Sequence, residues 1–446
     1  MPAARAPARP ALIESASFDL YETCLRLLGG AAHAGPASDG AGRRLPQSWN
    51  WSGPRGEPMD KVRFGVVGLG GMGSHHVGYF PRLQRAVLTA LCDSKPERLA
   101  RHKHLGLPTF ERYEDLLASG LVDAVLIATP HYDHPPITRA ALERKIHVLS
   151  EKPVAVTVGE ARKTNELYAR HPDLKYAVMF QTRTVARYRK MREMIASGEL
   201  GEVTRITWIA TNWFRTWTYY ASGGWRATWA GEGGGVLINQ NPHNLDLLQW
   251  IPNLMPRRVT AVAAIAKTHP IEVEDEVSAV LEYDNGAIGH FITSSGEAPG
   301  TDRLEIAGDR GKLISEEGKL RFVRTTASVR QVREHSPESF ANVETWDINI
   351  PCDSSRPEGH QAITQNFVNA ILNGEPLIAP GVEGVRGLEI GNAMLMAGVT
   401  RQPVELPLDA EAYEQLLEDL KKKYGGRKSL QARTGTTADL AGSFVK

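Results

Sequence analysis

The chain has 446 residues, with 52 Lys plus Arg against 51 Asp plus Glu, a formal net charge of +1, and hydrophobic residues make up 42% of it. This length predicts two folded domains, and the apolar content excludes wholesale disorder. The nearly balanced charge argues against a nucleic-acid or membrane-surface partner, and no run of about 18 apolar residues is present to cross a bilayer as a helix.

Residues 1–59 differ in composition from the rest, because Ala, Pro, Gly and Arg dominate and neither helical nor strand periodicity persists. We predict a disordered N-terminal extension; the alternative is that Met59 is the true first residue. Arg43 and Arg44 resemble an export signal, but polar residues follow where an apolar segment is needed, so we do not predict secretion. A reducing, cytoplasmic location is predicted from three scattered cysteines without C-x-x-C spacing, namely Cys24, Cys92 and Cys352.

Short apolar, β-rich runs alternate with helix-compatible stretches over residues 60–178, which we predict to form a dinucleotide-binding Rossmann domain. The first run, VRFGVVGLG, begins at Val62, and later runs end at Asp93, Pro130 and Pro153. Such alternation predicts a doubly wound parallel sheet, in which ligands bind at the carboxyl ends of the strands.

The pattern changes to longer alternating runs after about residue 178. These runs predict a large, mostly antiparallel open sheet and cover residues 203–214, 258–268, 277–295 and 302–318. Helical periodicity marks residues 363–374, 383–400 and 411–425. We therefore predict a substrate-binding and oligomerisation α/β domain over residues 179–408, followed by a C-terminal helix and tail over 409–446.

A glycine-rich turn follows the first predicted strand and opens a helix, which is the context a G-x-G-x-x-G motif needs to indicate dinucleotide binding. Gly68 permits the tight turn, Gly70 lets the backbone approach a pyrophosphate, and Gly73 brings the helix against the strand. The helix N-terminus offers free N–H groups to the anion. The cofactor-binding residues predicted here are Gly68, Gly70, Gly71, Met72 and Gly73.

An acidic residue, Asp93, closes the second predicted strand 20 residues after Gly73. Its carboxylate is suited to accept a hydrogen bond from a ribose 2′-hydroxyl and would repel a 2′-phosphate. We therefore predict NAD as the cofactor. The neighbouring Ser94 and Lys95 leave NADP as the alternative.

Five segments carry a likeness to a known family: GLGGMG and residues 128–138, 147–153, 233–246 and 304–313. Together they resemble the glucose-fructose oxidoreductase, inositol dehydrogenase and rhizopine-catabolism (Gfo/Idh/MocA) oxidoreductases over about residues 61–408. The resemblance implies a Rossmann domain followed by an α/β domain with a large open sheet. It also implies NAD(P) in the cleft, a sugar or cyclitol substrate, and a homodimer or homotetramer.

The resemblance implies a catalytic role for a lysine at the end of the fourth predicted strand. Lys152, in the sequence Glu151-Lys152-Pro153, matches the family lysine that lies beside nicotinamide and substrate. A hydride leaves the carbinol carbon only as the hydroxyl proton is lost, so a cation or base near that oxygen stabilises the developing alkoxide. Glu151 and Lys152 are also expected near the cofactor, with a cis bond before Pro153. The alternative is a solvated loop lysine.

A second catalytic candidate, His243, matches the histidine that many members use as a general base. Those members usually carry an aspartate four residues earlier, whereas this chain has Asn239, which can orient a partner but cannot accept a proton. We therefore predict a Lys152 and His243 catalytic pair, with Asn239 binding substrate. Asp246 is a further candidate that could contact substrate, support His243 or cap the helix.

The run His131-Tyr132-Asp133-His134 suggests a metal site at first sight. It lacks a further ligand and the helical spacing of zinc sites, so we predict no metal. In the family, the corresponding loop lines the nicotinamide pocket. The resemblance thus implies cofactor-proximal roles for Thr129, Pro130 and His134.

Five of the nine tryptophans fall within residues 208–229. An indole packs well on the apolar face of a pyranose, which predicts a carbohydrate site containing Trp225, with Arg215, Arg226, Asn212 and Asn239 bonding to hydroxyls. The alternative is a sheet core or a subunit interface. Residues 212–246 resemble the family branch that oxidises the 3-hydroxyl of glucosides.

The prediction is a cytoplasmic NAD-dependent oxidoreductase that transfers a hydride between a secondary hydroxyl of a sugar, glycoside or cyclitol and nicotinamide. The C3 hydroxyl of a glucoside is the first choice. The alternatives are an inositol dehydrogenase, an NAD-dependent glycosidase that acts by transient C3 oxidation and elimination, and a non-enzymatic NAD-sensing protein.

Overall fold

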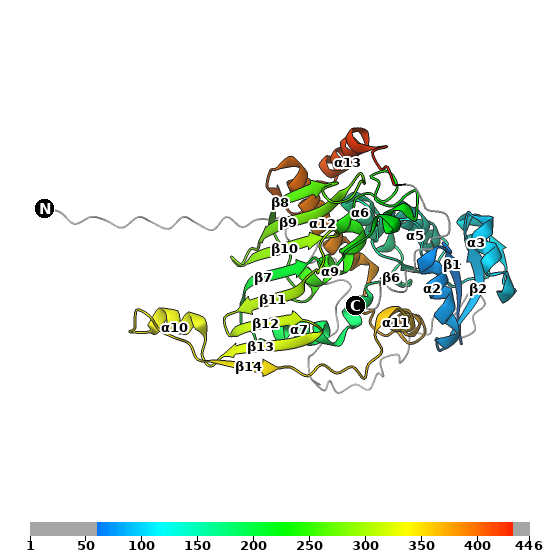
Figure 1. Cartoon of the computed structure of the whole chain (residues 1–446). Helices are drawn as coiled ribbons and strands as arrows, with labels where there is room; N and C mark the ends of the chain where they lie inside the picture. Colours follow the sequence, from blue (N-terminus) through cyan, green and yellow to red (C-terminus); the bar gives the residue numbers. More distant parts are fainter. Residues whose placement is uncertain (1–59, 431–446) are drawn as a thin grey trace, which may run out of the picture. The chain divides into compact units, whose positions relative to one another are not determined.

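The computed structural model describes residues 60–430, so the predicted N-terminal extension and the end of the predicted C-terminal tail lie outside the described residues. Two sheets organise the described part of the chain (Figure 1). No helix in this part is both long and apolar enough to cross a membrane.

The first sheet has six parallel strands in the order β3-β2-β1-β4-β5-β6. They are β1 (Val62–Val67), β2 (Ala86–Cys92), β3 (Thr109–Phe110), β4 (Ala124–Ile127), β5 (His147–Ser150) and β6 (Tyr176–Val178). The strand order reverses between β1 and β4, so these two strands flank the switch point at which such sheets bind ligands. The predicted doubly wound parallel sheet is confirmed.

Both faces of this sheet are buried. In β4, Ala124 and Leu126 pack into one hydrophobic cluster, whereas Val125 and Ile127 pack into another on the opposite face. Two-sided burial explains why these strands read as continuous apolar runs. The helices connecting the strands are α2 (Gly71–Tyr79), α3 (Pro96–Arg101), α4 (Tyr113–Ala118), α5 (His134–Glu143) and α6 (Val158–Tyr168).

The second sheet has nine strands in the order β14-β13-β12-β11-β7-β10-β9-β8-β15. They are β7 (Val203–Ala210), β8 (Arg258–Ile265), β9 (Glu274–Glu282), β10 (Ile288–Ser294), β11 (Asp302–Gly308), β12 (Gly311–Glu316), β13 (Lys319–Thr325), β14 (Thr345–Asn349) and β15 (Val404–Glu405). Every neighbouring pair is antiparallel except β7 and β10, which run parallel. The predicted mostly antiparallel sheet is confirmed.

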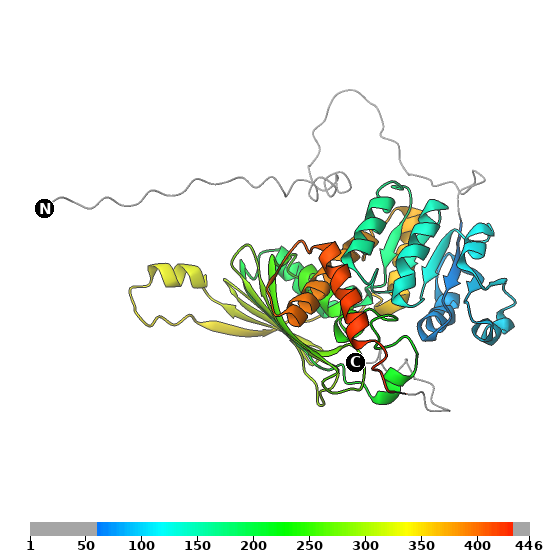
Figure 2. The same ribbon diagram turned by 90° about the horizontal axis from the view of Figure 1, so that it is seen from above.

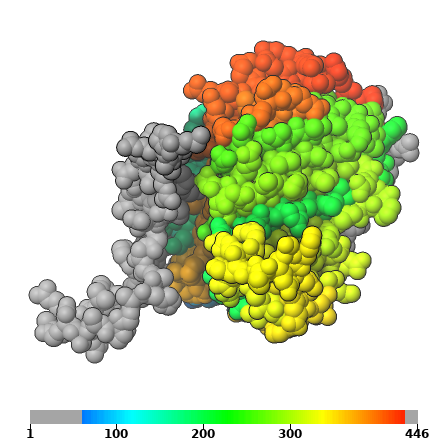
Figure 3. All heavy atoms as spheres, turned by 90° about the vertical axis from the view of Figure 1, so that its left-hand side faces the viewer, coloured from blue at the N-terminus to red at the C-terminus, as the bar shows by residue number. Residues whose placement is uncertain are grey.

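Helices cover one face of the second sheet, as Figure 2 shows. The α-helices after β6 are α7 (Ala186–Ala196), α8 (Trp217–Ala221), α9 (Pro242–Trp250), α10 (Val329–His335), α11 (Gly359–Asn373), α12 (Gly384–Thr400) and α13 (Ala410–Tyr424). The last three correspond to the three predicted helices. The opposite face of the sheet is open over β8, β9 and β10 and is visible in Figure 3.

Helix α11 follows the second sheet in sequence but packs against the first. The hydroxyl oxygens of Thr364 and Tyr79 lie 2.7 Å apart, and the Phe367 ring lies 6.1 Å from that of Phe64. The backbone N–H of Gln84 donates to the side chain of Gln365 at 2.8 Å. Helix α11 therefore links the part of the chain that follows the second sheet to α2 and to the first strands of the parallel sheet.

Candidate active site

The turn between β1 and α2 has the geometry that a pyrophosphate requires. Gly68 has φ of +92°, and a Cβ there would lie 2.6 Å from the carbonyl oxygen of Ala128. A Cβ on Gly73 would lie 1.7 Å from the Gly68 oxygen, so the helix can approach the strand only with glycine at this position. At Gly70, by contrast, an added Cβ would meet nothing within 4 Å, and no side chain caps the start of α2. Uncapped N–H groups thus adjoin open space that suits a phosphate.

Asp93 stands directly after β2 beside this turn and is almost fully buried. Its Oδ2 accepts a hydrogen bond from the Leu69 N–H at 2.7 Å and lies 3.3 Å from a guanidinium nitrogen of Arg98. Its Oδ1 accepts a hydrogen bond from the Lys95 N–H at 2.9 Å. These contacts hold a carboxylate at the end of β2, where it suits a ribose hydroxyl. The turn and Asp93 together fit NAD.

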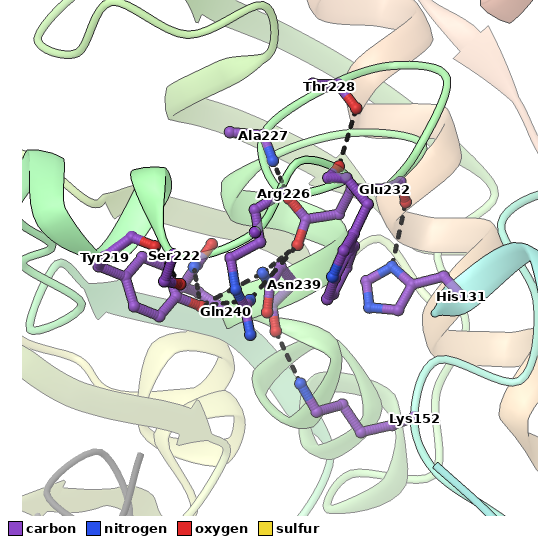
Figure 4. Close-up of polar contacts among 12 residues, drawn as sticks. His131, Lys152, Tyr219, Ser222, Arg226, Ala227, Thr228, Glu232, Asn239 and Gln240 are labelled. Carbon is purple, nitrogen blue, oxygen red and sulfur yellow. Dashed lines mark hydrogen bonds and ion pairs between the residues drawn. The ribbon is translucent and has the colours of Figure 1, made fainter. Parts of the chain in front are cut away.

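The corner after β5 carries Lys152, and the Lys152–Pro153 bond is cis. The Lys152 side chain crosses to the second half of the chain, where its Nζ donates to the main-chain oxygen of Asn239 at 2.8 Å (Figure 4). Burial lowers the pKa of Lys152, while the negative charge of Glu151 acts in the opposite direction. A lowered pKa brings an amine closer to serving as a base near neutral pH.

Glu151 is bound to the nucleotide-binding helix. Its Oε1 lies 2.7 Å from Nε2 of His76 in α2, and its Oε2 accepts the Lys152 N–H at 3.1 Å. Burial, the largest single effect, raises the pKa of Glu151, but the hydrogen bond and charge of His76, together with the charges of His360 and Lys152, outweigh it and lower the value to about 2. Glu151 therefore remains a carboxylate that ties the corner after β5 to the start of the cofactor site.

His243 lies in the first turn of α9, directly after Pro242. Its Nε2 is 3.1 Å from Nε2 of Gln181, which belongs to the 3-10 helix η4 (Gln181–Thr184). Its Nδ1 is buried and has no hydrogen-bond partner among the described residues. Burial, and next the charge of Lys152, lower the pKa of His243 well below its ordinary value, so the imidazole is neutral at neutral pH. The two predicted catalytic side chains are thus close enough to interact electrostatically.

Asn239 lies in a π-helical turn, η5 (Val236–Gln240), that precedes α9. Its side-chain amide donates to a carboxylate oxygen of Glu232 and to the hydroxyl of Tyr219, the latter at 3.3 Å (Figure 4). Glu232 is completely buried and accepts the Ala227 N–H at 2.5 Å. Burial raises the pKa of Glu232, and the nearby Arg226 guanidinium opposes this shift. Sequence reasoning missed this carboxylate.

Arg215, Trp225 and Arg226 gather around Tyr219. The two guanidinium carbons lie 5.1 Å (Arg215) and 4.8 Å (Arg226) from the Tyr219 ring centre, and Arg226 also lies 4.7 Å from the Trp225 ring. Arg226 additionally donates to the Tyr219 hydroxyl at 3.0 Å. These three predicted substrate residues therefore share one aromatic and cationic cluster, and Arg226 and Tyr219 connect it to Glu232 and Asn239.

The five crowded tryptophans serve different purposes. Trp208 and Trp229 are completely buried and belong to the hydrophobic core. Trp217 is 59% exposed, and Trp225 lies between these extremes with its ring 5.6 Å from that of His131. The core interpretation of this segment holds for two rings, whereas Trp225 adjoins the candidate site.

Thr129 and Pro130 lie in the loop after β4, and His134 is the first residue of α5. Both ring nitrogens of His134 are used, one 2.7 Å from the Pro153 oxygen and the other 2.9 Å from the Thr129 oxygen. The Thr129 hydroxyl is buried and has no hydrogen-bond partner among the described residues, next to the Gly68 turn. His134 thus joins this loop to the corner after β5. Among residues 60–430, no group of three or more His, Cys, Asp or Glu side chains is arranged to hold a metal ion.

Asp246 differs from the other substrate candidates in its surroundings. Its carboxylate forms two hydrogen bonds with Arg183, at 2.7 and 2.6 Å, and both side chains are completely buried. Arg183 also contacts Glu383 at 2.5 Å. The Asp246 carboxylate is therefore committed to an ion pair that fixes α9 to the neighbouring elements, and the structure does not bring it together with Asn239.

Four residues near the candidate site were not predicted: His76, Gln181, Tyr219 and Glu232. Glu232 directly precedes the three glycines of the 233–246 segment, and Tyr219 belongs to the aromatic run, so their positions in the sequence were a weak signal. His76 and Gln181 had none, because their partners lie 75 and 62 residues away.

Comparison with known proteins agrees with this geometry. Residues 62–180 match the model described as an oxidoreductase family with an NAD-binding Rossmann fold, and residues 188–314 match the GFO/IDH/MocA C-terminal domain. The chain is 28% identical over 295 residues to 1,5-anhydro-D-fructose reductase of Ensifer adhaerens, which covers 66% of this chain and 82% of the relative. It is 23% identical over 358 residues to myo-inositol 2-dehydrogenase of Thermotoga maritima, covering 77% and 98% of the two chains.

A similar solved structure is that of the WlbA dehydrogenase from Bordetella pertussis in complex with NADH and UDP-GlcNAcA. The TM-score is 0.66 with 26% identity, and the match covers 78% of this chain and 100% of the other.

Proposed function

Because the chain belongs to the Gfo/Idh/MocA family of NAD-binding oxidoreductases, we propose that it oxidises a secondary hydroxyl of a pyranose sugar or glycoside, with the C3 hydroxyl as the preferred position. The observation that carries the proposal is the meeting of Lys152, at the end of β5, with Asn239, at the edge of the aromatic and cationic cluster. This contact brings a partly buried amine next to residues suited to hold a sugar.

The chemistry follows from the protonation states. Bound NAD supplies the hydride acceptor. The Lys152 amine, whose pKa burial lowers, takes the hydroxyl proton of the substrate as the hydride departs, and the resulting ammonium keeps its hydrogen bond to the Asn239 oxygen. The neutral His243 imidazole offers a second acceptor for that proton.

The substrate class is supported by the cluster around Tyr219. The Trp225 ring provides an apolar surface for the C–H face of a pyranose, and Arg215 and Arg226 provide donors for its hydroxyls. Two of the similar proteins support a sugar substrate: one is named 1,5-anhydro-D-fructose reductase, and the WlbA dehydrogenase was crystallised with UDP-GlcNAcA. A second candidate function is inositol oxidation, which the match to myo-inositol 2-dehydrogenase favours.

The test is to incubate the purified full chain with NAD and a panel of glucosides, inositols and free hexoses while following the absorbance of reduced nicotinamide. We expect reduction with at least one glucoside and a loss of about 10²- to 10⁴-fold in kcat/KM for Lys152→Ala. The matched control is Lys422→Ala, which removes an exposed lysine of α13 and should leave activity unchanged.

The outcomes separate the alternatives. Reduction with inositols alone would replace the glucoside proposal by the second candidate. Aglycone release without accumulating NADH would indicate a glycosidase. Failure of every compound, with NAD binding intact, would contradict the substrate class and favour an NAD-sensing protein.

The proposal includes a homodimer or homotetramer in the cytoplasm. The open face of the second sheet exposes apolar side chains, among them Val262, Val280, Ile288 and Ile292, and such a face is suited to a second copy of the chain. The two cysteines in the described residues, Cys92 and Cys352, are free thiols, which fits a reducing compartment.

A further inference from the structure

The starting observation is a buried carboxylate that nothing in the proposed mechanism uses. Glu232 lies in the loop between α8 and η5 and has no exposed surface. A buried charge is costly unless it is paired, and buried titratable groups in such sites are candidates for function. Its nearest cation, Arg226, is 3.8 Å away, which is a loose contact for an ion pair, so pairing alone does not account for the carboxylate.

The Glu232 carboxylate is aimed at Asn239. One of its oxygens accepts the Asn239 side-chain amide, and the other accepts the Ala227 N–H at 2.5 Å. Asn239 stands where the resembling family members usually have an aspartate. The Asn239 amide is uncharged, but Glu232, seven residues earlier in the sequence, brings a carboxylate to this part of the site.

Asn239 also connects this carboxylate to the amine of Lys152. Its main-chain oxygen accepts the hydrogen bond from Lys152 Nζ at 2.8 Å, while its side-chain amide binds Glu232 (Figure 4). The negative charge of Glu232 favours the ammonium form of Lys152, against the effect of burial. The Glu232 carboxylate, Asn239 and the Lys152 amine thus form one hydrogen-bonded series.

Other charged and titratable groups face Lys152 and Glu232, the two ends of this hydrogen-bonded series. Those around Lys152 are Glu151, His131, Arg215, Arg226, His243 and His360. Those around Glu232 are Arg226, Tyr220, Glu274 and Lys428. Arg226 and Arg215 disfavour the ammonium of Lys152, whereas Glu151 and, to a smaller extent, Glu232 favour it.

We propose that Glu232 is a positioning residue of this site: it holds Asn239 in place through their hydrogen bond and adds a second negative charge, besides Glu151, near the Lys152 ammonium. The effect of Glu232 on catalysis rests on the proposed function. The contacts among Glu232, Asn239 and Lys152 can be tested without substrate turnover.

The experiment measures the reactivity of Lys152 in the NAD-bound protein. Competitive labelling with acetic anhydride over a range of pH, followed by proteolysis and mass spectrometry, reports the fraction of neutral amine at this lysine. In Glu232→Gln, which keeps the shape and removes the charge, we expect Lys152 to label about fivefold faster at neutral pH, because the ammonium loses its stabilising neighbour. Unchanged labelling would overturn the proposal.

Two further variants distinguish charge from shape and guard against misfolding. Glu232→Asp keeps the charge, so the Lys152 labelling rate should stay within about twofold of the original even though the contact with Asn239 is weakened. The double variant E232Q/N239D moves the carboxylate to position 239 and should restore slow labelling. A double variant that labels as fast as E232Q would contradict the proposal.

A matched control is Glu272→Gln, which neutralises another buried carboxylate near the same loop. Glu272 binds the Trp229 and Gly426 backbone N–H groups and has no contact with Asn239. Lys152 labelling should not change in this variant, and an equal change would indicate a general electrostatic effect, against a specific role for Glu232.

Activity provides a separate readout. If the wild type oxidises a carbohydrate, the acidic limb of its kcat/KM profile should move to lower pH in E232Q, because a weaker base loses its proton at lower pH. A merely structural role would lower activity without moving this limb. If the wild type oxidises nothing, the proposed function fails while the labelling result still decides the role of Glu232.

Discussion

Lys152 and Asn239 are hydrogen-bonded across 87 residues of sequence, with the lysine Nζ 2.8 Å from the main-chain oxygen of the asparagine. Lys152 follows β5 of the parallel sheet, and Asn239 lies in the π-helical turn before α9. The bond therefore joins the cofactor-binding half of the described chain to the half that carries the aromatic and cationic cluster. Lys152 is therefore the group that we propose as the base between cofactor and substrate.

Replacing Lys152 by Arg should preserve NAD binding and abolish oxidation. The guanidinium retains a positive charge but does not lose its proton at accessible pH, so it cannot accept the substrate proton. In the wild type, kcat/KM should rise with pH as Lys152 deprotonates, and the midpoint should lie below that of an ordinary lysine because burial lowers this pKa. Steady-state rates across pH measure both effects, and an active Lys152→Arg enzyme would contradict the assignment.

Replacing Gly70 or Gly73 of the turn by alanine should have different effects. Gly70→Ala should leave the melting temperature unchanged but weaken NAD binding at least about tenfold, since its Cβ meets no protein atom yet occupies the space a pyrophosphate needs. Gly73→Ala should lower the free energy of unfolding by about 3 kcal/mol, because its Cβ would lie 1.7 Å from the Gly68 oxygen. Thermal melts and NAD titrations check both, and equal losses of stability would refute the distinction.

Asp93 should determine the preference for NAD over NADP. In Asp93→Asn, the oxygen that accepts the Leu69 N–H remains while the charge that repels a 2′-phosphate disappears. Arg98, at 3.3 Å from the carboxylate, also becomes available to a phosphate. The ratio of kcat/KM values for NAD and NADP should fall at least about tenfold. Asp115→Asn on the surface of α4 is the control, and an unaltered ratio in the Asp93 variant would argue for another determinant.

The buried pair of Asp246 and Arg183 should govern stability. Asp246→Ala leaves a fully buried guanidinium without its main partner and should cost about 3–5 kcal/mol of the free energy of unfolding. Denaturant titration measures this loss. A variant that retains its stability but shows a raised KM for substrate would instead support the substrate role first considered for Asp246.

If the open face of the second sheet joins two copies of the chain, charged side chains placed on this face should weaken their association. Val262 is 53% exposed and Val280 is 41% exposed on the neighbouring strands β8 and β9. The double variant V262D/V280D should shift the mass measured by light scattering towards the monomer, because a desolvated carboxylate opposes association. Val329→Asp on α10 serves as the control. An oligomer of unchanged mass would place the interface elsewhere.

Local spacing in the sequence was sufficient to identify the turn at Gly68, Gly70 and Gly73, the strand that ends before Asp93, and the family. The turn and the acidic residue belong to one βαβ unit, in which Asp93 follows Gly73 by 20 residues, whereas the family was identified from five segments spread over residues 68–313. The doubly wound sheet and the mostly antiparallel sheet followed from the same kind of pattern. Lys152 and His243 were found through the resemblance, and their catalytic roles remain predictions.

Only the tertiary structure decided which side chains meet. Trp208 and Trp229 are core residues while Trp225 adjoins the site, although all three belong to one aromatic run. Asp246 contacts Arg183, which is 63 residues away in sequence, and Lys152 contacts Asn239, which is 87 residues away. No sequence period encodes such pairs, because they arise when packing brings distant segments together and every buried polar group must then find a partner.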